Sequence, residues 1–290
     1  MEGNGHNPEA SLPASAPHAR RRSPLPLIIV AALFIIVPFL TWYGTWFGRH
    51  LTDEEVGQYL ADQQNTRHVQ HALAQVEERM SKHDQSVKRW YPQIVALANS
   101  PESEIRKTVA WVMGRDGSSE EFHATLLRLL TDVEPIVRRN AAMALVNFND
   151  GKGRNELRAM LQPFDVAAPV EGTLNSVLPS GSPVTVGALL ARIRRGDGEI
   201  QELRSPVAGR IQSVSKREGE QVATAEKIFS IAPDTDSIEN ALVALAFVGE
   251  SEDLPVVESF ARGDGSTPVR IKKQAAVTAD AIKRRSSASH

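Results

Sequence analysis

Two stretches in the second half of the chain repeat one pattern, and this duplication strongly limits how the chain can fold. VAAPVEGTLNSV begins at Val166 and LRSPVAGRIQSV begins at Leu203, and their matching prolines, glycines and valines stand 37 positions apart. Short runs of Val, Ile and Leu alternate here with Pro, Gly, Ser and charged residues, as is typical of strands joined by turns. The duplication predicts an all-β module of two equivalent halves over residues 163–236, called the β module below.

A second repeat precedes the β module and is helical. The segments VQHALAQV, IRKTVAWV and VRRNAAMAL begin at Val69, Ile105 and Val137, with spacings of 36 and 32 residues. Each is amphipathic, and a further helix and a brief turn lead into the second and third. A two-helix unit that recurs in this way predicts a stacked α-solenoid over residues 51–162. Thr52, followed three residues later by Glu55, predicts a capping box at its first helix.

The helical units resemble HEAT repeats. The resemblance rests on the turn Asp132-Val133-Glu134-Pro135 and on the helix IVRRNAAMAL, in which Arg138 stands where such repeats commonly place a basic residue. It implies a scaffold built from antiparallel helix pairs.

The solenoid pattern resumes after the β module. ENALVALAFVGE, from Glu239, aligns with RNAAMALVNFND at a constant offset of 100, and Ile271 aligns with Val137. We therefore expect the β module to be inserted in the turn of one repeat, because such turns lie at the surface and tolerate insertions. Residues 237–284 are predicted to complete the repeats, and residues 285–290 to form a flexible tail.

The β module resembles the biotinyl/lipoyl-like domain family, over Val166 to Ala232. Carrier members of that family present a modified lysine on the hairpin between the halves, but Gly198 stands at that place here, and no lysine occurs between Gly153 and Lys216. The resemblance therefore implies the other branch, the barrel-sandwich domain of HlyD-type membrane fusion proteins, which are periplasmic adaptors. Arg194 and Arg195 are followed at once by Gly196-Asp197-Gly198, a turn too tight for the long coiled coil of those adaptors.

The N-terminal region suggests a membrane anchor. Residues 1–24 have the composition of a disordered tail, and the next 23 residues, 25–47, carry no charge. As a helix they would span about 34 Å, enough for a hydrocarbon core of about 30 Å. A cleaved signal peptide is disfavoured because no small-residue cleavage site follows, and a buried soluble helix because no face is polar.

The arginines Arg20, Arg21 and Arg22 precede the uncharged segment, and only Arg49 follows it closely. By the positive-inside bias, the N-terminus is expected in the cytoplasm and the body outside the inner membrane, on a single-pass anchor.

Charge and cysteine content exclude several functions. The net charge is −2, which disfavours a nucleic-acid partner, and the chain has no cysteine, which excludes disulfides and thiol chemistry. Candidate side chains for metal binding or catalysis are His68, His71, His83, His123, Asp53, Glu54, Glu55, Glu120, Glu121, Ser180, Ser182 and Ser205.

None of these candidates has the neighbouring groups that metal binding or catalysis requires. His68 and His71 lack a third ligand at helical spacing, the acidic groups are explained by the dipoles of helix N-termini, and the serines lack a neighbouring base. The Gly196 and Gly263 loops are expected to be ordinary turns. The basic pairs Arg138-Arg139 and Lys272-Lys273 are expected to form ion pairs along the stack. We predict no catalytic, cofactor or metal site.

The fold class predicted is an α+β multidomain protein with an N-terminal transmembrane helix, a HEAT-like solenoid and an inserted barrel-sandwich. The function predicted is a non-catalytic, membrane-anchored scaffold or adaptor for protein partners in the cell envelope, in transport or in assembly of a membrane complex. The alternative is a carrier or ligand-binding subunit of an enzyme complex.

Overall fold

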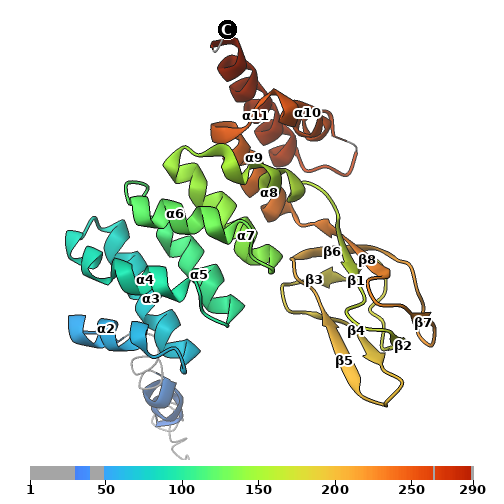
Figure 1. Ribbon diagram of the computed structural model, residues 1–290, viewed down its shortest axis with the longest axis horizontal. Helices are drawn as coiled ribbons and strands as arrows, with labels where there is room; N and C mark the ends of the chain where they lie inside the picture. Colours follow the sequence, from blue (N-terminus) through green and yellow to red (C-terminus); the bar gives the residue numbers. More distant parts are fainter. Residues whose placement is uncertain (1–29, 40–48, 264, 289–290) are drawn as a thin grey trace, which may run out of the picture. The chain divides into compact units, whose positions relative to one another are not determined.

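The computed structural model describes residues 30–39, 49–263 and 265–288 (Figure 1). The chain divides into two units, one ending at His50 and the other beginning at Leu51, and the second contains all the elements described below except the helix of residues 30–39.

The described residues of the first unit do not form the predicted membrane anchor. Residues 30–39 form a helix with mostly exposed side chains, and ten residues reach only about 15 Å. In the described part of the chain, no helix is both long and apolar enough to cross a membrane. This finding overturns the transmembrane helix predicted for residues 25–47 and the single-pass location in the inner membrane. A run of uncharged residues sets only an upper limit on helix length. The rest of that segment and the predicted tail, residues 1–24, lie outside the described residues.

Ten α-helices of the second unit form five consecutive antiparallel pairs (Figure 1). The pairs are α2 (Asp53–Ala61) with α3 (Thr66–Ser81), α4 (Tyr91–Leu97) with α5 (Ser103–Met113), α6 (Glu120–Leu129) with α7 (Pro135–Leu145), α8 (Arg154–Ala159) with α9 (Thr235–Val248), and α10 (Leu254–Arg262) with α11 (Val269–Ala288). Short 3-10 helices lie at Gln85–Trp90, Val146–Phe148, Gly151–Gly153 and Ser251–Asp253. Residues 285–288, for which a flexible tail was expected, are thus part of α11.

Local sequence signals explain where these helices begin. The Thr52 side chain accepts a hydrogen bond from the Glu55 amide, and Glu55 caps the Thr52 amide in return, so the predicted capping box is confirmed. The side chains of Asn65 and Ser119 accept a hydrogen bond from a backbone amide in the first turns of α3 and α6. Pro135 occupies the first turn of α7, where a backbone N–H would have no partner within the helix.

Two apolar cores run through the pairs. One is shared by the first three pairs and includes Leu73, Ile105 and Leu126; the other is shared by the last two pairs and includes Leu157 and Leu245. Because each core crosses from one pair to the next, no pair buries its apolar face alone.

The β module consists of two antiparallel four-stranded sheets, with strand orders β1-β8-β6-β3 and β5-β4-β2-β7. The strands are β1 (Phe164–Ala167), β2 (Gly172–Asn175), β3 (Pro183–Val184), β4 (Leu189–Arg194), β5 (Ile200–Arg204), β6 (Gly209–Val214), β7 (Gln221–Val222) and β8 (Lys227–Pro233). An offset of 37 or 38 residues maps β1–β4 onto β5–β8, and this mapping converts one sheet order into the other. Each sheet therefore takes two strands from each half.

The sheets are open, which corrects the predicted barrel-sandwich. In the described residues, no strand joins the two sheets into a closed barrel. One edge strand of each sheet, β3 or β7, has only two residues, and Pro183 of β3 lacks an amide donor. Each sheet therefore has one edge with few backbone groups for pairing with a further strand.

Strands β1 and β8, where the chain enters and leaves the β module, are neighbours. Phe164 stands opposite Ile231 in the antiparallel register. The insertion between α8 and α9 therefore begins and ends at nearly the same point, which allows those two helices to pack as a pair.

Gly172 and Gly209 occupy equivalent positions at the starts of β2 and β6. A Cβ atom at Gly209 would overlap the carbonyl oxygen of Ala232 and lie 2.9 Å from Ile231 Cγ2, and one at Gly172 would meet Arg194 and Ile193 in the same way. Only glycine permits these close backbone approaches.

We expect Gly209→Ala to lower the free energy of unfolding by about 2 kcal/mol, the typical cost of overpacking. Urea denaturation measures this as a lower midpoint at unchanged slope. Gly196→Ala is the matched control, because nothing lies within 4 Å of a Cβ at that position. Equal effects of the two substitutions would contradict the proposed steric constraint.

Candidate functional site

Four exposed or half-buried apolar side chains recur at one position of successive repeats. Each stands in the second helix of a pair, six residues after the position that aligns with Val137, and each is flanked along the helix mainly by buried residues. We call this set the apolar stripe; it comprises Trp111 in α5, Met143 in α7, Val243 in α9 and Val277 in α11. Trp111, Val243 and Val277 are 49%, 39% and 56% exposed. In the first repeat the equivalent residue is Gln75, which is buried and accepts a hydrogen bond from the Leu51 amide (2.8 Å), so the stripe begins at the second repeat.

A pocket of about 190 Å³ joins the first three members of the stripe. Its lining includes Trp111, Met143 and Val243, together with Phe247, which is 62% exposed, one turn further along α9. The pocket therefore bridges three helices that are far apart in the sequence. Exposed apolar side chains gathered at one place are typical of interaction surfaces.

Arg115 borders the stripe and holds its largest side chain. The guanidinium lies 4.3 Å from the centre of the Trp111 ring and 2.7 Å from Glu77 Oε1. A cation over an indole face stabilises that ring position. The Trp111 side chain is therefore held in one position at the surface.

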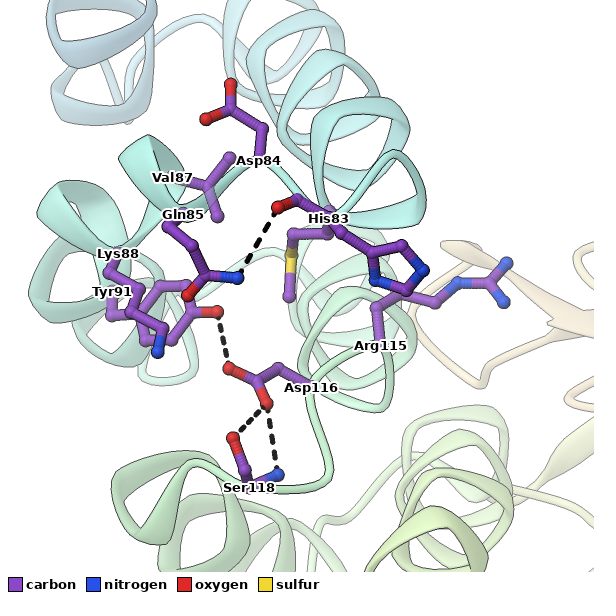
Figure 2. Close-up of a pocket in the computed structure, with 10 residues that line it drawn as sticks. His83, Asp84, Gln85, Val87, Lys88, Tyr91, Arg115, Asp116 and Ser118 are labelled. Carbon is purple, nitrogen blue, oxygen red and sulfur yellow. Dashed lines mark hydrogen bonds between the residues drawn. The ribbon is translucent and has the colours of Figure 1, made fainter.

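A second pocket, of about 140 Å³, is polar and lies among the turns that follow α3 and α5 (Figure 2). The Tyr91 hydroxyl donates to Asp116 Oδ2 (2.7 Å), and the Ser118 amide and hydroxyl donate to Asp116 Oδ1 (3.0 and 2.5 Å). Burial, and then the hydrogen bond to Asp116, raise the pKa of Tyr91 well above its usual range. The phenol therefore stays protonated at neutral pH and ties α4 to the turn that follows α5.

The histidines considered for metal binding make local contacts. His68 Nδ1 lies 2.8 Å from Asp62 Oδ2, and its ring stacks on Tyr59. His71 Nε2 lies 2.8 Å from Gln75 Nε2, and His123 Nε2 lies 2.7 Å from Asp150 Oδ2.

His83 lines the polar pocket. Among the described residues, no three His, Asp or Glu side chains gather closely enough to hold a metal ion. The structure therefore does not bring the four histidines into a common centre.

The acidic and serine candidates also have structural contacts. Asp53 accepts from Arg79 (2.6 Å) and Arg89 (2.7 Å), which ties α2 to the following elements. Ser180 donates to the Gln212 carbonyl (2.9 Å) and Ser205 to the Val207 carbonyl (2.6 Å), both inside the β module. The Ser182 carbonyl accepts from the Ile211 amide (2.9 Å). Glu54, Glu120 and Glu121 lie in the first turns of α2 and α6.

The described residues of the Gly196 and Gly263 loops form turns beside regular elements. Asp197 accepts from the Glu199 amide (3.0 Å) and closes the hairpin between β4 and β5, where Gly198 has φ +86°. Gly263 follows α10 with φ +55°, beside the aliphatic stem of Lys272. Asp264 lies outside the described residues.

Two arginines link successive repeats with the same geometry. Arg106 Nη1 donates to the carbonyls of Ser100 and Pro101, six and five residues earlier, and its Nε and Nη2 bind the Asp132 carboxylate (2.7 and 2.9 Å). Arg138 repeats this with the carbonyls of Asp132 and Val133 and with Glu156 (2.8 Å). The ion pairing predicted for Arg138 is thus confirmed.

Arg139 behaves differently from Arg138 and corrects the prediction of a second ion pair. It is 6% exposed, its Nε has no hydrogen-bond partner, and its guanidinium lies 5.7 Å from the centre of the Phe164 ring. Burial lowers its pKa, although Glu156 and Asp234 oppose this. Because Phe164 belongs to β1, the contact joins the solenoid to the start of the β module.

The sequence reasoning missed the apolar stripe. The signal was available, since the repeat alignment already placed Trp111, Met143, Val243 and Val277 at one position. Their exposure was not visible, because the helices carry apolar residues on more than one side. The arrangement at the stripe offers packing surface and charge, and no reacting group of the described residues lines its pocket.

Comparisons with known proteins support the repeat character. A family model of HEAT repeats matches residues 91–168, which confirms the HEAT resemblance in that range. HEAT repeats are protein-interaction modules, because stacked repeats create extended binding surfaces.

Two solved structures show only distant similarity. A single-chain, multi-domain long-chain acyl-CoA carboxylase is 20% identical, with a TM-score of 0.24, over 47% of this chain and 14% of that chain. An engineered protein is 16% identical, with a TM-score of 0.40, over 79% of each chain. No curated protein matches the sequence. These values carry no inference about function, and the resemblance of the β module to biotinyl/lipoyl-like domains is not confirmed by them.

The pair between Arg106 and Asp132 gives a prediction about stability. Burial opposes ionisation of Asp132, but hydrogen bonds from Arg106 and the Glu134 amide outweigh it, so the pKa of Asp132 lies below its usual value. We expect Asp132→Asn to lower the free energy of unfolding by about 3 kcal/mol at pH 7, because Arg106 stays buried without its counter-charge.

The pH dependence of this effect has a definite sign. A carboxylate with a lowered folded pKa stabilises the protein above its unfolded pKa of about 3.9 and loses that contribution as pH falls through the folded pKa. The difference between wild type and Asp132→Asn should therefore shrink below about pH 4. Asp197→Asn, in an exposed pair with Arg195, is the control and should change stability by less than about 0.5 kcal/mol. A difference that is independent of pH would contradict this account.

Proposed function

We propose that the chain is a non-catalytic scaffold that binds a protein partner on the apolar stripe. The observation that carries the proposal is the recurrence of an exposed or half-buried apolar residue at one position of four successive repeats. A side chain left in water by chance would not recur in register with the repeats. Burial of such residues against a partner gains about 25 cal/mol per Å² of apolar area.

The alternative function, a carrier or ligand-binding subunit, has less support. In the hairpin between β4 and β5, Arg195 forms ion pairs with Asp197 and Glu199, and Gly198 stands where a carrier lysine would stand. The polar pocket beside Tyr91 is small, and its carboxylate is already satisfied by neighbouring donors. The balanced charge of the chain, −2 overall, gives no support to a nucleic-acid partner.

Substitution of the apolar stripe tests this function. We expect Trp111→Asp and Val243→Asp to abolish binding of the partner, because each places an unpaired charge in the surface that the partner would bury. The measurement is quantitative mass spectrometry of cross-linked proteins recovered with the full chain, compared between wild type and each variant.

Val133→Asp is the matched control. Val133 is 82% exposed but lies in the turn before α7, outside the stripe. Proteins recovered with wild type and Val133→Asp, and lost from both stripe variants, support the proposal. Recovery of the same proteins with all four chains rules out the stripe as the binding surface. Circular dichroism of each variant checks that the helices remain folded.

A further inference from the structure

We infer that the β module is hinged to the solenoid at Arg139 and turns as one body between two positions. In the docked position, which this structure shows, the module covers Arg139. In the released position the Arg139 side chain lies in water. The inference concerns the joint between the two folds, and it does not depend on the proposed function of the apolar stripe.

Arg139 of α7 lies where the chain enters and leaves the β module. Its guanidinium is 5.7 Å from the centre of the Phe164 ring, which belongs to the first residue of β1. Asp234, the residue between β8 and α9, attracts the same charge, as does Glu156 of α8. One buried cation therefore lies beside both crossings of the chain.

The docked position keeps this charge buried without a polar partner. Arg139 is 6% exposed and its Nε has no hydrogen-bond partner, and within the described residues its side chain forms no ion pair. A buried charge is costly unless it is paired and hydrogen-bonded. The face of an aromatic ring offsets only part of that cost. Release of the module therefore gives Arg139 the hydration that it lacks.

The joints between helix pairs are built differently from this one. Arg138, the neighbour of Arg139, donates to two backbone carbonyls and to Glu156. Apolar cores also cross from one pair to the next. The polar groups at those joints are satisfied and the apolar contacts are continuous, so the repeats form a firm base for the module.

No such core crosses the joint between the solenoid and the β module. Leu161 belongs to the core of the last two helix pairs and Val166 to the core of the module, and these two cores have no residue in common. Between them, Gln162 and Pro163 are exposed. On the other side, Asp234 alone separates β8 from α9. The joint is therefore narrow and has little apolar contact to hold it closed.

The β module can turn without losing its own structure. Phe164 packs against the module core, which includes the fully buried Leu174 and Phe229. Because β1 and β8 are neighbours in one sheet, the two crossings lie side by side and provide a single axis. Residues at the ends of such elements absorb the backbone rotation of a hinge while the bodies on either side stay rigid.

Distance measurements between spin labels on the full chain test the hinge. Since the chain has no cysteine, cysteines introduced at two exposed residues carry the labels alone. We choose Glu121 of α6 and Glu218 in the turn between β6 and β7. Double electron–electron resonance then gives the distribution of distances between the solenoid and the module. A control pair, Glu54→Cys with Glu121→Cys, lies within the solenoid and reports changes in the repeats themselves.

We expect two distances between the solenoid and module labels, one for each position of the hinge. Phe164→Leu removes the aromatic face and should raise the ratio of released to docked chains about threefold. Arg139→Met replaces the buried charge with an apolar side chain and should lower that ratio about tenfold. Neither substitution should change the distance within the control pair.

The opposite directions of these two effects distinguish a hinge from an ordinary contact. If Arg139 and Phe164 simply held the module in place, both substitutions would release it. Changes in the same direction therefore overturn the hinge, as does a single distance that neither substitution alters. An equal change within the control pair would place the motion in the repeats, which also overturns it.

Discussion

Each helix pair of this protein shares its apolar core with a neighbouring pair, and the rest of the structure depends on this stacking. The cores containing Leu73 and Leu245 both cross pair boundaries, so the position of each repeat is fixed by its neighbour. Arg106 and Arg138 add a polar link with the same geometry at successive boundaries. Stacking in register also places equivalent residues at equivalent surface positions, which is how four separate helices come to share one apolar stripe.

The β module is compatible with this stacking because of how its chain ends meet. Entry strand β1 and exit strand β8 are hydrogen-bonded neighbours, so about 70 residues can be inserted in one repeat while α8 and α9 still pack together. The interleaving of strands from both halves makes the module depend on the whole duplication, since neither half contains a complete sheet. The buried guanidinium of Arg139 against Phe164 then provides a contact between the module and the solenoid.

The sequence was informative where local rules decide structure. The capping box at Thr52 and the arginine contact at Arg138 follow from residue type and spacing, and both were predicted correctly. The prediction of a membrane helix was wrong, since no helix of the described residues is long and apolar enough to cross a membrane. The prediction of an ion pair for Arg139 was wrong because Arg138 and Arg139, adjacent on one helix, point in different directions. Only the packing of β1 shows that Arg139 is the buried one.

The sequence by itself determined the repeat period, the resemblance of residues 91–168 to HEAT repeats and the duplication within the β module, because an alignment of the chain with itself shows these patterns. Only the tertiary structure decided that each sheet combines strands from both halves, that the sheets stay open, and that Trp111, Met143 and Val243 line one pocket. The strand order and the exposure of side chains depend on contacts between residues distant in the chain. Patterns within a single sequence do not specify those contacts.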